Sequence, residues 1–122
     1  MTTLFVYGTL KRGGSNHAHL AGQKFLGPAR TAAGYTLISL GDYPGLVRSA
    51  DDREGVTGEL WSVDDPCLAH LDEFEGITEN LYRRAEIPLA TPCSLGSAAP
   101  VETYFYARPV AGRPHLGPTW SV

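Results

Sequence analysis

The chain has 122 residues, 43% of them hydrophobic, and a formal net charge of −3, a profile typical of one globular domain with its own core. Its ten Lys and Arg residues are scattered, so the sequence predicts no basic stripe that follows a nucleic-acid backbone. The apolar runs are too short to span a membrane, and the first residues lack the pattern of a secretory signal. We therefore expect a single cytoplasmic domain over residues 1–122, with neither nucleic acid nor a membrane as a partner.

Glycines and prolines divide the chain into short segments, which favours many strands and turns. In chain order, the sequence predicts strands at Leu4–Tyr7, within Arg30–Leu40, at Val56–Val63, at Tyr82–Leu89 and at Val101–Ala107, with a short extended piece at Leu46–Arg48. Leu4–Tyr7 does not alternate polar and apolar residues, so we expect burial on both of its faces. A turn at Gly41–Gly45, a loop at residues 90–100 and an irregular tail at residues 109–122 complete this reading.

One clear helix follows the third of these strands. Asp65 is the candidate N-cap, Pro66 suits the first helical position and Gly76 stands where a C-cap glycine is common. A weaker, short helix is predicted after Ser15. The elements together predict a mostly β domain, a curled sheet or small barrel with one or two helices against it.

The two cysteines, Cys67 and Cys93, do not form a Cys-x-x-Cys pair. In a reducing compartment we expect two free thiols rather than a disulfide. A catalytic thiol needs a neighbouring base, and nothing in the sequence identifies one.

Three acids end the predicted helix, and helical geometry separates them. At about 100° per residue, Glu73 falls opposite the apolar arc, Asp72 at its edge and Glu75 inside it. Burial raises the pKa of a carboxyl group, which makes it a usable proton carrier near neutral pH. In the alternative reading, the helix ends before Glu75 and its side chain turns to solvent or pairs with Arg83 or Arg84. A metal site is disfavoured because no His joins these acids at ligand spacing.

Two motifs carry a family resemblance. "FVYGTLKRG" with a following "NH" pair is succeeded much later by "LDEFEG" and "LYRR", and "GDYPGLV" and "GELWSV" lie between them. With these motifs, the chain resembles the gamma-glutamylcyclotransferase-like family from Leu4 to about Arg108, most closely its gamma-glutamylamine cyclotransferase branch and small bacterial relatives. The resemblance implies an α+β fold, a small mixed β-barrel of about five to seven strands flanked by one or two helices.

The same resemblance implies a lyase that removes a gamma-glutamyl group by cyclisation. The products are 5-oxoproline and a free amine, and no metal, nucleotide or redox cofactor is required. The matching positions are a substrate-binding loop and one general acid/base, namely Tyr7, Gly8, Thr9 and Leu10, and Glu75. A tight turn at Gly8 leaves backbone N–H groups open to a carboxylate and to a developing oxyanion.

Further candidates are less specific. Asn16 could line the pocket mouth or cap a helix. Tyr43, with Pro44, could form the pocket wall or only a turn, and Tyr82 could reach the site or belong to the core. His17 and His19 are expected on the surface, and Tyr104 is expected in the core.

Three functions remain open at this point. The leading one is the cyclotransferase, acting on a small gamma-glutamyl substrate as a monomer or weak homo-oligomer. The alternatives are a non-catalytic binding module of the same fold, or a lyase that removes a gamma-glutamyl group from a specialised metabolite. The basic residues near the motifs favour a neutral or cationic leaving amine, such as a lysine side chain, because Lys11 and Arg12 are expected in solvent and only one of Arg83 and Arg84 can face a pocket.

Overall fold

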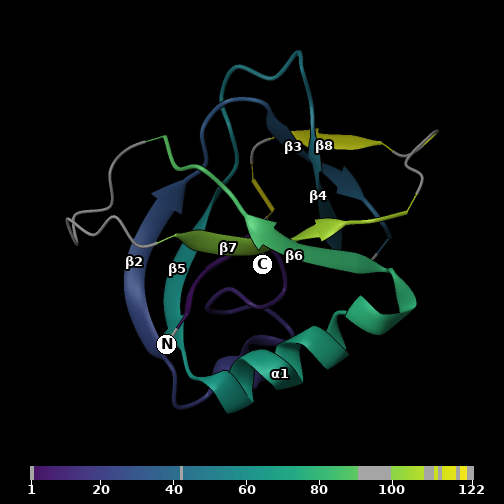
Figure 1. Ribbon diagram of the computed structural model, residues 1–122. Helices are drawn as coiled ribbons and strands as arrows, with labels where there is room; N and C mark the ends of the chain where they lie inside the picture. Colours follow the sequence, from purple (N-terminus) through teal and green to yellow (C-terminus); the bar gives the residue numbers. More distant parts are fainter. Residues whose placement is uncertain are drawn as a thin grey trace.

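The computed structural model describes residues 2–41, 43–90, 100–108, 112, 114–117 and 119–120. Within them, eight strands form one mixed sheet, and the helix α1 crosses one end of it (Figure 1). The elements are β1 (Thr2–Val6), η1 (His17–Leu20), β2 (Lys24–Arg30), β3 (Tyr35–Ser39), β4 (Pro44–Arg48), β5 (Thr57–Val63), α1 (Asp65–Phe74), η2 (Ile77–Glu79), β6 (Tyr82–Glu86), β7 (Val101–Tyr106) and β8 (His115–Gly117), where η1 and η2 are 3-10 helices. In this part of the chain, no helix is both long and apolar enough to span a membrane.

The α+β class is as predicted, but the described sheet is not a closed barrel. Its strand order is β2-β5-β1-β7-β4-β3-β8, and β6 pairs with β7. Because β6 runs along one edge of β7, the parallel neighbours β1 and β4 share the other edge, at Glu102 and at Phe105 respectively. The sheet therefore divides at β7 into two groups of strands, and in the described residues no ladder joins the outer strands β2 and β8, so the barrel expectation is wrong.

The Tyr7 side chain lies where β1 and β4 diverge. Its hydroxyl donates to the carbonyl oxygen of Tyr104 at 2.6 Å and accepts from the N–H of Leu46 at 3.3 Å. Nearby, the Thr103 hydroxyl donates to the carbonyl oxygen of Phe5 at 2.8 Å. Side chains thus provide hydrogen-bond partners for backbone groups that would be unpaired where β1 and β4 diverge. The chain after Tyr7 is free to leave the sheet as a loop.

Two strands are absent from the sequence-based expectation. β2 contains Gly27 and Pro28, both of which usually argue against a strand interior. They are tolerated because β2 lies at the end of the strand order and its register with β5 shifts between Phe25 and Gly27. β8 lies within the tail expected to be irregular, and it forms because β3 has an edge open to it.

The helix α1 begins one residue earlier than expected. Its N-cap is Asp64 rather than Asp65, because the Asp64 carboxylate accepts a hydrogen bond from the N–H of Cys67 at 2.8 Å. At the other end, Gly76 adopts a φ of 70°, the left-handed conformation that ends many helices. Cys67 is a free thiol. Cys93 and most of the predicted loop at 90–100 lie outside the described residues.

Candidate active site

A cavity of about 300 Å³ opens where β1 ends, at the lower end of the sizes common for small-molecule sites. Its walls come from the loop after β1, the β3–β4 loop, the end of α1, and the strands β6 and β7. The structure brings every sequence-predicted site residue to this cavity: Tyr7, Gly8, Thr9, Leu10, Asn16, Tyr43, Glu75 and Tyr82. Sequence reasoning did not identify Phe74, Leu81 or Tyr104 as lining residues.

The loop Tyr7–Leu10 presents unpaired backbone donors. The carbonyl groups of Gly8 and Thr9 accept hydrogen bonds from the N–H groups of Lys11 and Asn16, at 3.1 and 2.9 Å. The N–H groups of Gly8, Thr9 and Leu10 have no hydrogen-bond partner among the described residues. Three consecutive backbone donors at a cavity wall can bind a carboxylate or a carbonyl oxygen.

Gly8 is required by close packing. A Cβ atom on Gly8 would lie 2.8 Å from Cγ of Pro44 and 3.0 Å from its Cδ. Pro44 is buried at the start of β4, so it cannot move away from the loop. The loop therefore passes close to β4 only because position 8 has no side chain.

Asn16 holds the loop rather than capping a helix. Its side-chain amide donates to the Thr9 hydroxyl at 2.9 Å, and it makes no side-chain capping bond to η1. Asn16 thus occupies the N-cap position of η1, but its side chain binds the loop instead of making a capping bond. The N–H of Asn16 also donates to the Thr9 carbonyl. Asn16 therefore fixes the conformation of the loop through both its backbone and its side chain.

Glu75 directs its carboxyl group into the cavity. It follows the last residue of α1, and its N–H still donates to the carbonyl oxygen of Leu71 at 2.8 Å, so the helical geometry extends to it. Burial raises the pKa of the Glu75 carboxyl from 4.5 to about 7. No residue of the described ranges makes an ion pair or hydrogen bond with this carboxyl group.

The two arginines that could have paired with Glu75 are engaged elsewhere. Arg84 contacts both carboxylate oxygens of Asp72, at 2.8 and 3.0 Å, and Oε1 of Glu102 at 2.6 Å. Arg83 lies over the ring of Phe105, 5.5 Å from its centroid. The alternative in which either arginine neutralises Glu75 is therefore wrong.

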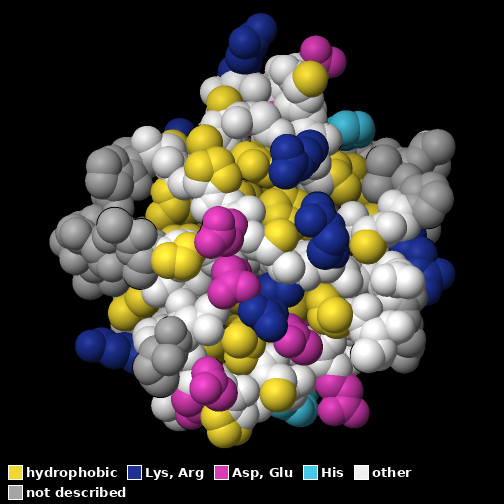
Figure 2. All heavy atoms as spheres, viewed as in Figure 1, with side chains coloured by type: hydrophobic (Ala, Val, Ile, Leu, Met, Phe, Trp, Pro, Cys, Tyr) yellow, Lys and Arg dark blue, Asp and Glu magenta, His cyan; other side chains and the backbone are white. Residues whose placement is uncertain are grey.

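The Arg84 ion pairs connect α1 to the sheet next to the site. Asp72 is on α1, Arg84 on β6 and Glu102 on β7, and the Tyr104 hydroxyl also donates to Asp72 at 2.7 Å. Figure 2 shows acidic and basic side chains next to one another on the face that carries β6 and α1. This network fixes the last turn of α1, which carries Glu75.

Two tyrosines complete the inner wall with their hydroxyl groups already paired. Tyr82 donates to the carbonyl oxygen of Pro44 at 3.1 Å, and Tyr104 donates to Asp72. Burial raises the pKa of both phenols well above the ordinary value, so both stay neutral. Their rings form a wall, and Glu75 is the lining residue that can exchange protons near neutral pH.

No metal-binding group of three or more His, Cys, Asp or Glu side chains occurs among the residues that the structure describes. The chemistry that the cavity offers comes from the backbone donors of the loop after β1 and from the protonatable carboxyl group of Glu75. That pair can hold a polar substrate and move a proton on it.

Comparisons with known proteins identify the family of the chain. Residues 4–121 match the family described as "Gamma-glutamyl cyclotransferase, AIG2-like". A Vibrio cholerae protein named provisionally as a gamma-glutamylcyclotransferase is 43% identical over 90 residues, which is 72% of this chain and 75% of that protein. The gamma-glutamylaminecyclotransferase of Rattus norvegicus is 35% identical over 71% of this chain, and the match spans 62% of the rat protein.

A solved structure shares the fold. The crystal structure of an AIG2-like protein from Mus musculus superposes with a TM-score of 0.83 at 27% identity, covering 99% of this chain and 88% of the mouse chain. The family match extends over nearly the whole sequence and includes both the loop after β1 and the end of α1. The chain therefore belongs to the gamma-glutamyl cyclotransferase, AIG2-like family.

Proposed function

We propose that the chain is a gamma-glutamylamine cyclotransferase, which cyclises the gamma-glutamyl group of a substrate amide and releases 5-oxoproline and a free amine. The observation that carries this proposal is the position of Glu75. Its carboxyl group, with a pKa of about 7, belongs to the same cavity lining as Gly8, Thr9 and Leu10, whose N–H groups have no partner among the described residues.

The reaction needs only proton transfers and oriented donors. The substrate α-ammonium gives a proton to the Glu75 carboxylate, and the resulting amine attacks the γ-carbonyl carbon. The new C–N bond closes a five-membered lactam, and the backbone N–H groups of the loop stabilise the oxyanion that develops. The protonated Glu75 gives its proton to the nitrogen of the leaving amine, and the bond from that nitrogen to the carbon breaks. The Glu75 carboxylate then takes the second proton from the new ring nitrogen, which leaves a neutral lactam, and passes it to the released amine, which departs as an ammonium. Because the nucleophile and the carbonyl belong to one molecule, binding in a folded conformation accelerates ring closure.

Names of relatives support amide substrates. Besides the rat protein, a Niallia circulans protein named gamma-L-glutamyl-butirosin B gamma-glutamyl cyclotransferase is 35% identical over 70% of this chain, and the match spans 56% of that protein. The first name specifies a gamma-glutamylamine and the second gamma-L-glutamyl-butirosin B. Both are consistent with removal of a gamma-glutamyl group, and they differ in the leaving amine.

The charges around the cavity favour a neutral or cationic leaving amine. Among the described residues, those that line the cavity include no Lys or Arg. Lys11 donates to the carbonyl oxygen of Trp120, and Arg12 pairs with Glu59 at 3.1 Å. A substrate with a carboxylate on the leaving side would therefore find no cationic side chain in the lining to receive it.

The test is a 5-oxoproline assay with gamma-glutamyl-ε-lysine, gamma-glutamyl-alanine and glutathione. We expect turnover that is fastest for the lysine derivative. Glu75→Gln keeps the shape of the side chain and should lower kcat by about 10²–10⁴-fold. Glu73→Gln, one residue before Phe74 on the exposed side of the helix, is the matched control and should keep kcat.

Three outcomes would contradict the proposal in whole or in part. Binding of these compounds without any release of 5-oxoproline would favour the non-catalytic binding module. Turnover that survives Glu75→Gln but not Glu73→Gln would show that Glu75 is not the acid/base. A clear preference for glutathione would overturn the choice of leaving amine.

A further inference from the structure

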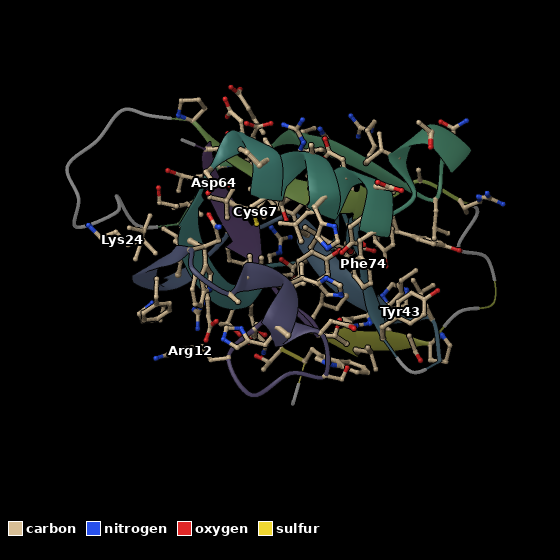
Figure 3. All side chains as sticks on the ribbon, turned by 90° about the horizontal axis from the view of Figure 1, so that it is seen from below. Arg12, Lys24, Tyr43, Asp64, Cys67 and Phe74 are labelled. Carbon is tan, nitrogen blue, oxygen red and sulfur yellow. The ribbon has the colours of Figure 1, made fainter. Side chains whose placement is uncertain are left out.

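Two large aromatic side chains are exposed in the lining of the cavity. Tyr43 is 38% exposed and Phe74 41% exposed, and these are the large hydrophobic side chains found exposed in the described part of the chain. Tyr43 is on the β3–β4 loop and Phe74 is the last residue of α1. Figure 3 shows both labelled side chains close together, and both line the cavity. Exposed aromatic residues gathered at a cavity are typical of ligand-binding surfaces.

Phe74 is held in position from outside the cavity. The His19 ring packs against it with the ring centroids 4.3 Å apart. His19 is in turn 2.8 Å from Nε2 of His70 through its Nδ1. Neither histidine lines the cavity, so both support the Phe74 ring without occupying the space beside it.

The lining of the cavity therefore offers two kinds of chemistry. The loop after β1 offers the backbone N–H groups of Gly8–Leu10 and the Asn16 side chain. The β3–β4 loop, the end of α1 and β6 offer the rings of Tyr43, Phe74 and Tyr82, and the Tyr82 hydroxyl is already bonded to the Pro44 carbonyl. A glutamyl group, with a carboxylate and a carbonyl, matches the loop. A substituent attached to the amide nitrogen would then extend toward the rings.

We propose that Tyr43 and Phe74 form the binding subsite for the leaving amine, and that this subsite selects amines that carry a hydrocarbon chain. The inference rests on the proposed cyclotransferase function. Flat aromatic rings bury alkyl groups well and attract an ammonium group over their faces. A carboxylate at the same place would lie against the negative faces of the rings, without a cationic partner among the described lining residues.

The first test compares leaving groups that differ in length and charge. The substrates are gamma-glutamyl methylamide, gamma-glutamyl butylamide and the gamma-glutamyl amide of 4-aminobutyrate. In the last of these, a carboxylate replaces the terminal methyl group of the butyl chain. We expect kcat/KM for the butylamide to exceed that for the methylamide by about tenfold, the value for three methylene groups half-buried on binding. The carboxylate-bearing amide should be poorer than the butylamide.

The second test removes the rings one at a time. Phe74→Ala and Tyr43→Ala should each reduce the butylamide-to-methylamide ratio toward one. Phe74→Leu, which keeps apolar surface, should retain an intermediate ratio, and Tyr43→Phe should retain the full ratio because the ring is preserved. Glu73→Ala, next to Phe74 and exposed, is the matched control and should leave the ratio unchanged.

Binding separates this inference from the proposed function. In the Glu75→Gln variant, calorimetry gives the Kd of both amides without turnover. A Kd ratio of about ten that falls in Glu75→Gln/Phe74→Ala supports the subsite, even if the wild-type protein releases no 5-oxoproline and the proposed function is wrong. Equal Kd values for the two amides, or a ratio that neither Phe74→Ala nor Tyr43→Ala changes, would overturn the subsite even if the protein is a cyclotransferase.

Discussion

Glu73 and Glu75 flank Phe74 at the end of α1, and their side chains lie in different environments. Glu73 is exposed, whereas Glu75 lines the cavity. The two side chains differ by roughly 200° around the helix axis. Because they share composition and local backbone, differences between their variants report the environment of the carboxyl group. The pair is therefore an internal control for everything attributed to Glu75.

The raised pKa of Glu75 predicts a stability cost that depends on pH. The folded state holds a proton on Glu75 up to about pH 7, whereas the unfolded chain releases it near pH 4.5, so the folded protein loses stability as pH rises between these values. Glu75→Gln removes this cost. We expect it to raise the free energy of unfolding at pH 8 by roughly 2–3 kcal/mol, and by much less at pH 4. Urea unfolding at both pH values measures this, and Glu73→Gln should show no such difference.

The same carboxyl group predicts the acidic limb of the activity profile. If Glu75 accepts the first proton, kcat/KM should fall about tenfold per pH unit below about pH 7, where its carboxyl is protonated. The residual activity of Glu75→Gln should lack this limb. A wild-type profile that stays flat down to pH 5 would contradict the assignment of Glu75 as the base.

Close packing at Gly8 predicts a steep dependence on side-chain size. Gly8→Ala should weaken substrate binding because its Cβ atom would lie 2.8 Å from Pro44 and displace the loop, and Gly8→Val should abolish measurable binding. Thr9→Ser keeps the hydroxyl that accepts from Asn16 and should bind within a few-fold of wild type. Calorimetric titration with 5-oxoproline tests this, and equal loss in Gly8→Ala and Thr9→Ser would show that the backbone is not the binding element.

Local signals were sufficient for the elements that carry the site. The unbroken apolar run of β1 and the Pro66 and Gly76 limits of α1 are short-range patterns, and periodicity placed Glu75 on the inner side of that helix. The strand β2 could not be predicted in this way. Gly27 and Pro28 break its local pattern, and only its place at the end of the strand order makes them tolerable.

The sequence could not show which polar side chains pair with one another. Whether Arg84 pairs with Glu75 or Asp72 depends on the position of β6 relative to α1, which no local pattern contains. The same is true of Tyr104, whose aromatic-rich strand marks a core residue but whose hydroxyl reaches Asp72 across 32 positions of sequence. Closure of the sheet likewise depends on how β1 and β4 divide one edge of β7.

We expect that removing the Tyr7 hydroxyl lowers the stability of the fold. Tyr7→Phe would leave the Tyr104 carbonyl and the Leu46 N–H without their buried partner, and we expect a loss of about 2–3 kcal/mol in the free energy of unfolding. Tyr82→Phe removes a hydroxyl with a single partner, the Pro44 carbonyl, and should cost about 1 kcal/mol. Chemical denaturation of both variants makes the comparison, and an equal cost would mean that Tyr7 does not bridge the two strands.

The Arg84 network predicts unequal effects for its members. Removing the guanidinium group in Arg84→Met leaves Asp72 and Glu102 as neighbouring acids, whereas Asp72→Asn leaves Arg84 paired with Glu102 and Tyr104 still with an acceptor. Asp72 and Arg84 are each about a quarter exposed, so solvent screens their attraction.

We therefore expect Arg84→Met to cost about 2 kcal/mol in unfolding free energy, Asp72→Asn about 1 kcal/mol, and their coupling in a double-mutant cycle to be about 1 kcal/mol. Arg83→Met, the preceding residue of β6 and exposed, is the matched control and should cost less than 0.5 kcal/mol by the same reasoning about surface charges. Because the network holds the turn of α1 that carries Glu75, Arg84→Met should also lower kcat, whereas Arg83→Met should not. A coupling energy near zero, with kcat unchanged in Arg84→Met, would mean that the ion pairs do not position the helix end.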